Sequence, residues 1–402
     1  MSFTWATIGQ NVDKIKTWNP LKSEQLTTFK YIDLGSLDKD KKEICLDLVQ
    51  EISSSEAPSR ARQLVKTGDV LISTVRPNLN GIAVVPKELD GATASTGFCV
   101  LRANEEKLDS TYLRYWVEST TFVSDMVNKS TGASYPAVSD KIINDSELPL
   151  PPLETQKQIA AVLEKADQLR KDCKLLEQEL NSLAQSVFIE MFGDPATNPK
   201  GWKIGTIAEL LSSANYGTSE KSSTDILKYP VLRMNNITYE GNWDFTSLKY
   251  MDMDEKDEDK YLVQDGDILF NRTNSKELVG KTAVYREKEP MAYAGYLVRA
   301  RCNKFGHPDY ISSFMNSKYG KQTLQTMCKS IVGMANINAK EFQSIKIAKP
   351  PIELQIDFSV RIAKIRALIQ EVKLQDIEYQ KVFNALMQKA FSGELNLANV
   401  KT

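Results

Sequence analysis

Residues 278–282 have the types that a phosphate-binding loop needs. They read LVGKT, and a nucleotide-binding loop ends in the same Gly-Lys-Thr. The glycine that opens such a loop would fall on Ser275, and no strand-then-helix pattern of the required kind surrounds the segment. The sequence therefore does not predict a nucleotide site here.

Other groups that could carry catalysis lack partners. The one histidine, His307, cannot complete a triad or a metal site without other ligands, so a loop role is the better interpretation. Glu105 and Glu106 could be half of a nuclease-type acidic cluster, but the paired metal-binding carboxylates are missing. The chain also lacks an Asn-Pro-Pro-Tyr-like tetrapeptide and a glycine-rich methyl-donor loop. We predict no catalytic residue, metal or cofactor in this chain, and no enzyme activity.

The composition is typical of a globular protein. Hydrophobic residues make up 42% and charged residues 26% of the 402 residues, a length that suggests two or three domains. The five cysteines are never spaced C-x-x-C, which argues against a disulfide framework and a zinc site. No apolar run of roughly 18 residues exists, and the first residues lack a signal-peptide pattern. We expect a cytoplasmic protein without membrane contact.

The charge balance is nearly neutral. The chain has 51 basic and 52 acidic residues, for a net charge of -1. A nucleic-acid-binding protein that works alone usually has a basic excess. This balance counts against DNA binding, unless basic residues cluster on one face or partner subunits supply further phosphate contacts.

A long internal repeat organises the chain. Residues 148–163 read LPLPPLETQKQIAAVL, and residues 347–362 read IAKPPIELQIDFSVRI. Pro151 aligns with Pro350 and Gln156 with Gln355, at 350 − 151 = 199 positions. Upstream, LVKTGDVLI (64–72) matches LVQDGDILF (262–270) at an offset of 198. The chain is thus a tandem duplication, in which each half has a module of ~150 residues followed by one long helix.

Each copy of the motif opens a helix with heptad spacing, because its apolar residues step alternately by three and four. Glu154 and Glu353 lie in the first turns, where the helix dipole favours a carboxylate, and Gly193 and Gly393 supply the stops. We predict an antiparallel coiled coil of two rods ~60 Å long, with the modules at opposite ends. Gln375 interrupts the second seam. The predicted helix-pair core is Ile159, Val162, Ala166, Leu169, Cys173, Leu176, Leu180, Leu183, Val187, Phe358, Ile362, Ile365, Leu368, Val372, Tyr379, Val382 and Leu386.

The modules are predicted to be α+β, with mixed α/β character. Short β-branched runs lie between Gly, Asn and Pro residues, and one amphipathic helix is expected near 110–128 and another near 308–328. Residues 212–225 are expected to be a loop and 252–259 a solvated acidic run. The predicted segments are module one at 1–150, the central helix at 151–194, module two at 195–348, the C-terminal helix at 349–395 and a tail at 396–402.

Two unlike modules, each followed by a Pro-Pro-Leu/Ile-Glu-x-Gln helix that ends in Phe-Gly or Phe-Ser-Gly, resemble the specificity (S) subunit of Type I restriction–modification systems. The resemblance covers essentially the whole chain. Residues 149–194 and 348–395 resemble the two spacer regions of that family. In the second half, YGTSEKSS, LRMNNI, GDILFNRTNS, LVGKT and GMANIN resemble one type of target recognition domain. The first module matches more loosely, through LVKTGDVLISTVRPNLNG and the following Gly97-Phe98.

The resemblance implies a non-catalytic DNA reader. Each recognition domain would read one half of an asymmetric bipartite target in double-stranded DNA, and the helix pair would set the spacer. Two modification subunits would dock on the helices, bring S-adenosylmethionine and methylate adenine. Through them, restriction subunits would add translocation and cutting that need ATP and Mg.

The resemblance also implies that Gly-rich loops touch DNA. Arg pairs with guanine and Asn with adenine in the major groove, whereas Lys more often contacts phosphate. For any single residue the alternative is a turn or capping role, because Asn and Ser favour turns. The candidates are Arg60, Arg62, Arg76, Asn78, Asn80, Lys129, Ser134 and Tyr135 in the first half, and Tyr216, Lys221, Arg233, Asn235, Asn236, Arg272, Asn274, Lys276 and Asn336 in the second.

Two other readings stay open at the level of sequence. A structural adaptor would use the rod to hold two protein-binding modules apart, without DNA. A fused endonuclease or methyltransferase would be active as the purified chain. Sequence-selective, salt-sensitive DNA binding distinguishes the specificity subunit from the adaptor.

Overall fold

The computed structural model describes residues 3–23, 27–331, 334–398 and 400. Gly333 of the GMANIN segment and tail residues 399, 401 and 402 lie outside the described residues. The chain divides into two compact units, of which unit 1 is Met1–Asp172 with Gln375–Thr402 and unit 2 is Cys173–Leu374. Each unit therefore contains one module, the first half of the helix that follows it and the last half of the other helix.

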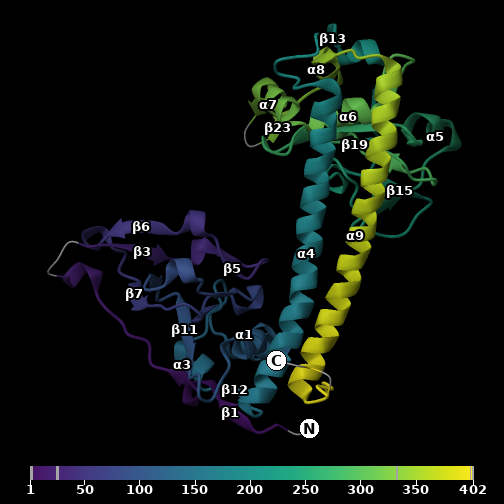
Figure 1. Cartoon of the computed structure of the whole chain (residues 1–402). Coiled ribbons are helices and arrows are strands. Elements are labelled where there is room, and N and C mark those ends of the chain that lie inside the picture. The colour runs from purple at the N-terminus through teal and green to yellow at the C-terminus, as the bar shows by residue number, and fades with distance from the viewer. Residues whose placement is uncertain (1–2, 24–26, 332–333, 399, 401–402) are drawn as a thin grey trace. The chain divides into compact units, whose positions relative to one another are not determined.

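The module of unit 1 contains two four-stranded sheets (Figure 1). The first sheet has, in spatial order, β2 (Val12–Asp13), β11 (Phe98–Ala103), β8 (Val70–Ser73) and β9 (Ile82–Val84). The second has β6 (Gln50–Ser53), β3 (Thr28–Ile32), β10 (Thr93–Ser95) and β7 (Ala61–Leu64), with β10 parallel to β3. Two short pairs complete the module, β4 (Leu37–Asp38) with β5 (Glu43–Ile44) and β1 (Trp5–Thr7) with β12 (Glu147–Pro149).

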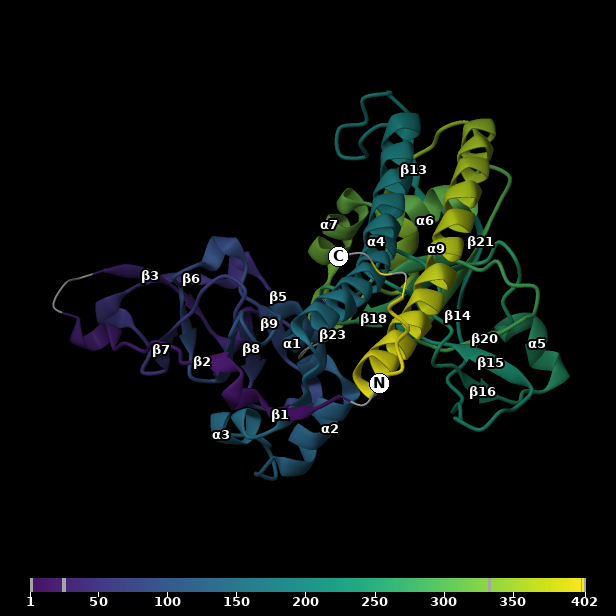
Figure 2. The ribbon, with the colours of Figure 1, turned by 60° about the horizontal axis from the view of Figure 1, so that its bottom comes forward.

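The module of unit 2 repeats this plan. Figure 2 gives a second view of this module. Its larger sheet contains β14 (Leu211–Tyr216), β21 (Leu297–Cys302), β17 (Ile268–Asn271) and β19 (Thr282–Val284). A three-stranded sheet contains β16 (Lys249–Met251), β15 (Tyr229–Leu232) and β20 (Ala292–Tyr293), with β20 parallel to β15. The remaining strands are β13 (Ile204–Thr206) with β24 (Lys346–Ala348), and β18 (Thr273–Asn274), β23 (Met334–Asn336) and β22 (Lys329–Ile331).

Where one helix per module was predicted, the structure has two. These are α1 (Ser110–Glu118) with α2 (Thr120–Lys129), and α6 (Pro308–Asn316) with α7 (Lys318–Met327). Ser119 and Ser317 separate them because each has an extended backbone and its side chain caps the second helix. Each module also has a further short helix, α3 (Asp140–Asn144) or α8 (Ala339–Ser344). The loop prediction for residues 212–225 needs correction, since residues 211–216 form β14. The acidic run at 252–259 enters α5 (Glu255–Tyr261), and most of its residues are exposed, as expected.

The repeated Gly-Asp before strands β8 and β17 has a structural role. Gly68 and Gly266 have φ of +86° and +87°, values that side chains rarely adopt. The following carboxylate, Asp69 in unit 1, accepts hydrogen bonds from Arg102 at 2.8 and 2.6 Å. In unit 2 Asp267 accepts them from Arg301 at 2.7 and 3.1 Å. The motif therefore ties a tight turn to the neighbouring strand in both modules.

The two long helices are α4 (Leu153–Phe192) and α9 (Ile352–Ser392). Both begin after Pro-Pro with a glutamate in the first turn, and both end at a glycine with positive φ, +83° at Gly193 and +78° at Gly393. These starts and stops are as predicted, because the first residues of a helix tolerate proline and its end favours a left-handed glycine.

Within each unit the two helix halves run antiparallel, which confirms the prediction. In unit 2, the rings of Phe188 and Phe358 lie 5.7 Å apart, and Lys373 pairs with Glu177 at 3.3 Å. In unit 1, the Gln158 amide near the start of α4 donates to the carbonyl of Val400, in the tail that follows the end of α9, at 3.4 Å. Further along, the Arg170 guanidinium lies over the Phe383 ring at 4.5 Å. In both units the residue number rises along one helix as it falls along the other.

The predicted seam was wrong at five of its seventeen residues. Leu169, Leu176, Leu183, Leu368 and Val382 are 39%, 43%, 47%, 48% and 50% exposed. The buried stripe keeps eight predicted residues, which are Ile159, Ala166, Cys173, Leu180, Phe358, Ile362, Ile365 and Val372. It adds Leu163 and Phe188 in α4 and Ile369 and Phe383 in α9. Each long helix has further apolar residues beside these buried positions. Such a broad apolar face does not specify which of its edges meets the other helix.

The glutamine of the repeated motif joins each long helix to its module. Gln156 is fully buried, and its amide donates to the carbonyls of Lys107 at 3.0 Å and Pro151 at 2.9 Å. Its side-chain oxygen accepts from the Asp109 N–H at 2.9 Å. Because Asp109 caps helix α1, the glutamine fixes the start of that helix against the start of α4.

The ion pairs between helix and module have opposite polarity in the two units. In unit 1, Asp167 of α4 accepts from Arg114 of α1 at 3.2 Å. The equivalent position in α9 is Arg366, at 366 − 167 = 199, and it donates to Asp309 of α6 at 2.6 Å. The long helix therefore supplies the acidic residue of the ion pair in unit 1 and the basic residue in unit 2.

Candidate nucleic-acid interface

A strained loop follows strand β8 in the first module. Arg76 and Asn80 have φ of 54° and 48°, and they flank a short 3-10 helix at Pro77–Leu79. Positive φ is uncommon for arginine, whereas asparagine adopts it more readily, and such residues occur mainly at functional sites and tight turns. The Arg76 N–H donates to the Pro136 carbonyl at 2.7 Å, which ties this loop to a second one.

These two loops carry several of the predicted residues, and two of them are in contact. The Arg76 guanidinium lies 4.7 Å from the centre of the Tyr135 ring, and Tyr135 is 67% exposed. Ser134 is exposed beside Tyr135, and Asn78 is exposed on the Arg76 loop. A guanidinium stacked on an exposed ring is held ready to donate, with less side-chain freedom to lose on binding.

Other predicted residues of the first module have structural partners. The Asn80 amide donates to the Glu118 carbonyl at 3.2 Å, and the Arg62 guanidinium donates to Asn19 Oδ1 at 2.5 Å. Lys129 pairs with Asp125 at 2.7 Å but stays exposed, and Arg60 is exposed at a separate turn. Asn80 and Arg62 are better explained as loop supports than as base readers.

The second module has a matching arginine–tyrosine pair. Arg272 lies between β17 and β18, with its guanidinium 4.8 Å from the centre of the Tyr216 ring. The Tyr216 hydroxyl accepts from the Ala339 N–H at 2.9 Å, which fixes the ring. Arg272 Nε has no hydrogen-bond partner among the described residues. Asn336 lies opposite Thr273 in the β18–β23 pair, so Tyr216, Arg272 and Asn336 lie close together.

Asn236 is a correction to the predicted interface. It is 1% exposed, its oxygen accepts from the Arg233 N–H at 2.9 Å, and its amide donates to the Asp244 carbonyl at 2.9 Å. Arg233 donates to the Ser247 carbonyl at 2.8 Å. Asn236 therefore closes a turn, as Asn commonly does. Asn235, Lys221 and Lys276 are exposed, whereas Asn274 is half-buried and accepts from the Ser275 N–H at 2.9 Å.

Tyr296 belongs to the same surface, although the sequence did not single it out as a site residue. It is 54% exposed, and its carbonyl accepts from the Arg272 N–H at 3.0 Å. Its equivalent in the first module is Phe98, at 296 − 98 = 198, and Phe98 is fully buried. In the sequence, only the hydroxyl that distinguishes Tyr296 from Phe98 indicates that this position is exposed in the second module.

No group of residues suited to a metal ion occurs in the part of the chain that the structure describes. No helix within the same residues is long and apolar enough to cross a membrane.

The comparisons with known proteins identify the family. The model of the Type I restriction modification DNA specificity domain matches residues 20–184 and again residues 199–378. The chain belongs to this family. The two matches, each covering one module and part of the following helix, confirm the tandem organisation and the resemblance drawn from the sequence.

Known relatives agree. The chain is 23% identical over 317 residues to the Type I restriction enzyme EcoKI specificity subunit of Escherichia coli K12, covering 74% of this chain and 68% of the relative. It is 28% identical over 198 residues to the putative type I restriction enzyme MjaX specificity subunit of Methanocaldococcus jannaschii, covering 48% and 46%.

Two solved structures resemble the fold. One, described under complex assembly and conformational transition of the type I R-M system, has 25% identity, a TM-score of 0.59 and 98% coverage of both chains. The S subunit of a Type I restriction–modification system from M. genitalium has 13% identity and a TM-score of 0.56, covering 97% of this chain and 96% of that one, which supports the fold alone.

The chain is thus a Type I specificity subunit with two DNA-sequence recognition domains. Specificity subunits are the non-catalytic members of their complexes, and this chain is accordingly not an enzyme. Family membership favours this reading over the structural adaptor and over a fused endonuclease or methyltransferase.

Proposed function

We propose that each recognition domain reads one half of an asymmetric bipartite site in double-stranded DNA, and that the helix pair sets the spacer between the halves. The observation that carries this proposal is that each compact unit contains one module joined to both antiparallel helices. A module on such a unit cannot move independently of the helices. Two continuous helices of ~40 residues, ~60 Å long, are long enough to span the ~34 Å of one DNA turn.

We propose that the two arginine–tyrosine pairs contact the bases of the DNA target. Arg76 with Tyr135 and Arg272 with Tyr216 present a preordered guanidinium at the corresponding end of each module's sheet, where it can bond bidentately to guanine. The residues around the two pairs differ, Asn78 and Ser134 in one case and Tyr296 and Asn336 in the other. Two unlike base-contacting surfaces recognise two unlike half-sites, and the target is therefore asymmetric.

The exposed leucines support docking of two partner subunits. Two exposed apolar pairs recur at the same offset of 199 and lie on one face of each helix: Leu169 and Leu368, Leu183 and Val382. Rows of exposed apolar residues on soluble proteins often mark interfaces. Because the rows are equivalent by the repeat, they fit two copies of one protein, which we propose to be the modification subunit.

In this proposal the chemistry comes from the partners. The modification subunits bring S-adenosylmethionine and methylate adenine, and restriction subunits recruited through them use ATP and Mg for translocation and cutting. The partners also share the phosphate contacts that a chain of net charge -1 does not supply alone. We place the complex in the cytoplasm, where it meets DNA.

The proposal that the helix pair sets the spacer can be tested with insertions at the boundary of the two units. One heptad inserted after Asp172 and one after Leu374 keeps the helices in register and adds ~10 Å to the pair. The methylated sites should keep both half-sites but have a spacer longer by about three base pairs at ~3.4 Å each, and occupancy should fall because DNA twist changes by about a third of a turn. Methylome sequencing of cells that express the complex gives the answer. Changed half-sites, or an unchanged spacer, would contradict the proposal that the helix pair sets the spacer.

A matched control inserts the heptad into α4 alone. The seam of buried residues is then out of register along half the pair, so methylation should be lost rather than moved to a new spacer. Exchange of residues 1–150 for another recognition domain should change one half-site only.

A further inference from the structure

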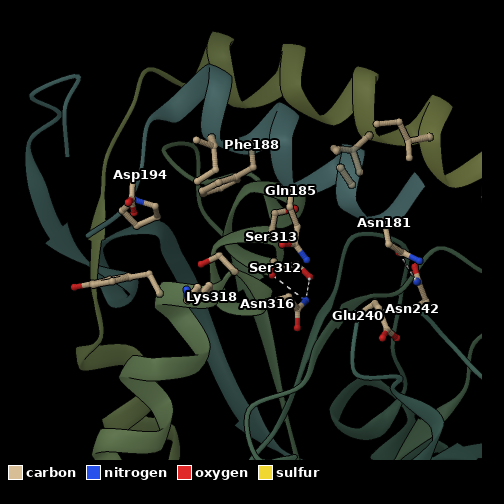
Figure 3. A pocket seen from close by; sticks show the side chains of 18 of the residues that line it. Asn181, Gln185, Phe188, Asp194, Glu240, Asn242, Ser312, Ser313, Asn316 and Lys318 are labelled. Atoms are coloured by element: carbon tan, nitrogen blue, oxygen red, sulfur yellow. Dashed lines mark hydrogen bonds between the residues drawn. The ribbon is translucent and has the colours of Figure 1, made fainter. Parts of the chain in front are cut away.

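Unit 2 contains a cavity of about 520 Å³ between its module and its helix halves, shown in Figure 3. This volume is in the range of small-molecule and side-chain binding pockets, ~300–1,000 Å³. Helix α4 contributes Phe188 and Ala184, α9 contributes Ile362 and Ile369, and α6 contributes Ser313.

The repeat explains why this space is hollow. Helices α1 and α6 align at an offset of 198, so Ser313 occupies the place of Tyr115 in unit 1. Helices α4 and α9 align at 199, so Ala184 occupies the place of Phe383. At two facing positions unit 2 therefore has a small residue where unit 1 has an aromatic ring.

Unit 1 shows what the space accommodates. Tyr115 is fully buried there and Phe383 is 7% exposed, with ring centroids 6.0 Å apart in an edge-to-face arrangement. Arg170 lies over Phe383 and Arg114 over Tyr115, at 4.5 and 4.8 Å. The equivalent volume thus has the shape for two edge-to-face rings, each with a cation over its face.

The lining of the cavity still favours a ring. Phe188 and Tyr319 supply aromatic walls, and Arg366 supplies a cation held by Asp309 at 2.6 Å. Edge-to-face and cation–π contacts with these groups would hold an incoming ring.

The rim offers hydrogen bonds. The polar side chains of Gln185, Gln322 and Ser313 line the cavity. Figure 3 shows Gln185 facing Ser312, Ser313 and Asn316 across the hollow, with Glu240 and Asn242 at one end. Side-chain amides can donate to and accept from a peptide backbone, which suits a chain segment that enters with its ring pointing inward.

We propose that this cavity receives one aromatic side chain from a segment of the modification subunit. The inference rests on the proposed function and deepens it, because it names one attachment point of that partner. Unit 1 already fills the equivalent space with its own Tyr115 and Phe383, so only one of the two modification subunits uses such an anchor. The two partners are therefore held unequally, although they dock on equivalent rows of leucines.

The test transfers the two rings from unit 1 to unit 2. The full-length double variant S313Y/A184F should fold, because unit 1 packs the same two rings at the equivalent positions. Wild type should bind two modification subunits in native mass spectrometry, and the variant should bind the second copy at least tenfold more weakly while retaining the first. S344Y, which adds a ring at an exposed position of α8 in the same unit, should bind both copies like wild type.

A second measurement uses a free probe. N-acetyl-tyrosinamide at millimolar concentration should show saturation transfer from the wild-type chain, and N-acetyl-leucinamide much less. Both signals should be absent with S313Y/A184F. Equal binding of the two probes to wild type would overturn the proposal. So would tight binding of two modification subunits to S313Y/A184F. The proposal would also fail if S313Y/A184F lost a dimer of the chain itself and not a modification subunit. Failure of wild type to bind any modification subunit would instead overturn the proposed function.

Discussion

The side-chain oxygen of Gln355 accepts a hydrogen bond from the backbone N–H of His307 at 2.8 Å. Its amide donates to the carbonyls of Phe305 at 3.0 Å and Pro350 at 2.9 Å. Gln156 makes the same three kinds of bond in the other unit. This equivalence explains why the sequence repeats Pro-Pro-x-Glu-x-Gln, because the glutamine satisfies three backbone groups where module and helix meet.

Gln355→Leu should destabilise unit 2. The substitution leaves buried backbone groups without partners, at a cost of about 1–3 kcal/mol in the free energy of unfolding. Urea denaturation followed by circular dichroism measures this cost. Gln370→Leu, at an exposed position of the same helix, is the matched control and should change stability by less than about 0.5 kcal/mol. Equal stabilities of the two variants would show that the motif has no role in anchoring the helix.

Asp309 should make the stability of unit 2 sensitive to acid. Burial alone would raise the pKa of Asp309, but Arg366, Arg286 and the Ser359 hydroxyl outweigh it and hold the pKa below its ordinary value. His307 also faces the carboxylate, and burial lowers the pKa of that imidazole. A lowered carboxyl pKa stabilises the fold above the unfolded-state pKa of ~3.9 and loses that contribution as the pH falls through the folded-state value.

Asp309→Asn is the corresponding variant. At pH 7 it should lose about 1.5–3 kcal/mol of unfolding free energy, because a charged hydrogen-bonding network loses its anion. Between pH ~4 and lower values its stability should fall less steeply than that of wild type. Urea titrations over this range measure both effects. Parallel pH profiles for the two proteins would mean that Asp309 does not titrate with folding.

Leu183→Gln and Val382→Gln should weaken partner binding without weakening the fold. The two residues are 47% and 50% exposed at equivalent positions, so replacement removes little buried apolar surface from the chain itself. Binding of modification subunits, measured by titration calorimetry, should fall several-fold for each variant, and the urea midpoint should stay within error of wild type. Leu163→Gln, at a fully buried position, should do the reverse and reduce stability first.

Sequence spacing was sufficient for the tandem plan, the helix limits and the antiparallel pairing. It failed at part of the seam, where Leu169 and Leu368 have the right spacing but are exposed, whereas Leu163 and Ile369 are buried. Only three-dimensional packing decides between two adjacent apolar edges. The interface shows a similar limit, since Asn236 has the residue type of a base reader but closes a turn, whereas Tyr296 differs from Phe98 by one hydroxyl and is exposed. Residue type does not reveal exposure within a loop.

Arg272→Lys should reduce specific DNA binding and relax the choice of base at one position. Lysine keeps the charge but loses the planar fork that bonds bidentately and stacks on Tyr216. The expected loss is about 1–3 kcal/mol, or roughly 5- to 150-fold, in the affinity of the assembled complex for its target. Fluorescence anisotropy on duplexes with single base changes measures it. Lys256→Ala on helix α5, which removes a charge among acidic neighbours, is the control and should bind DNA like wild type. If Arg272→Lys lowers the affinity for every duplex equally, the guanidinium contacts phosphate and does not read a base.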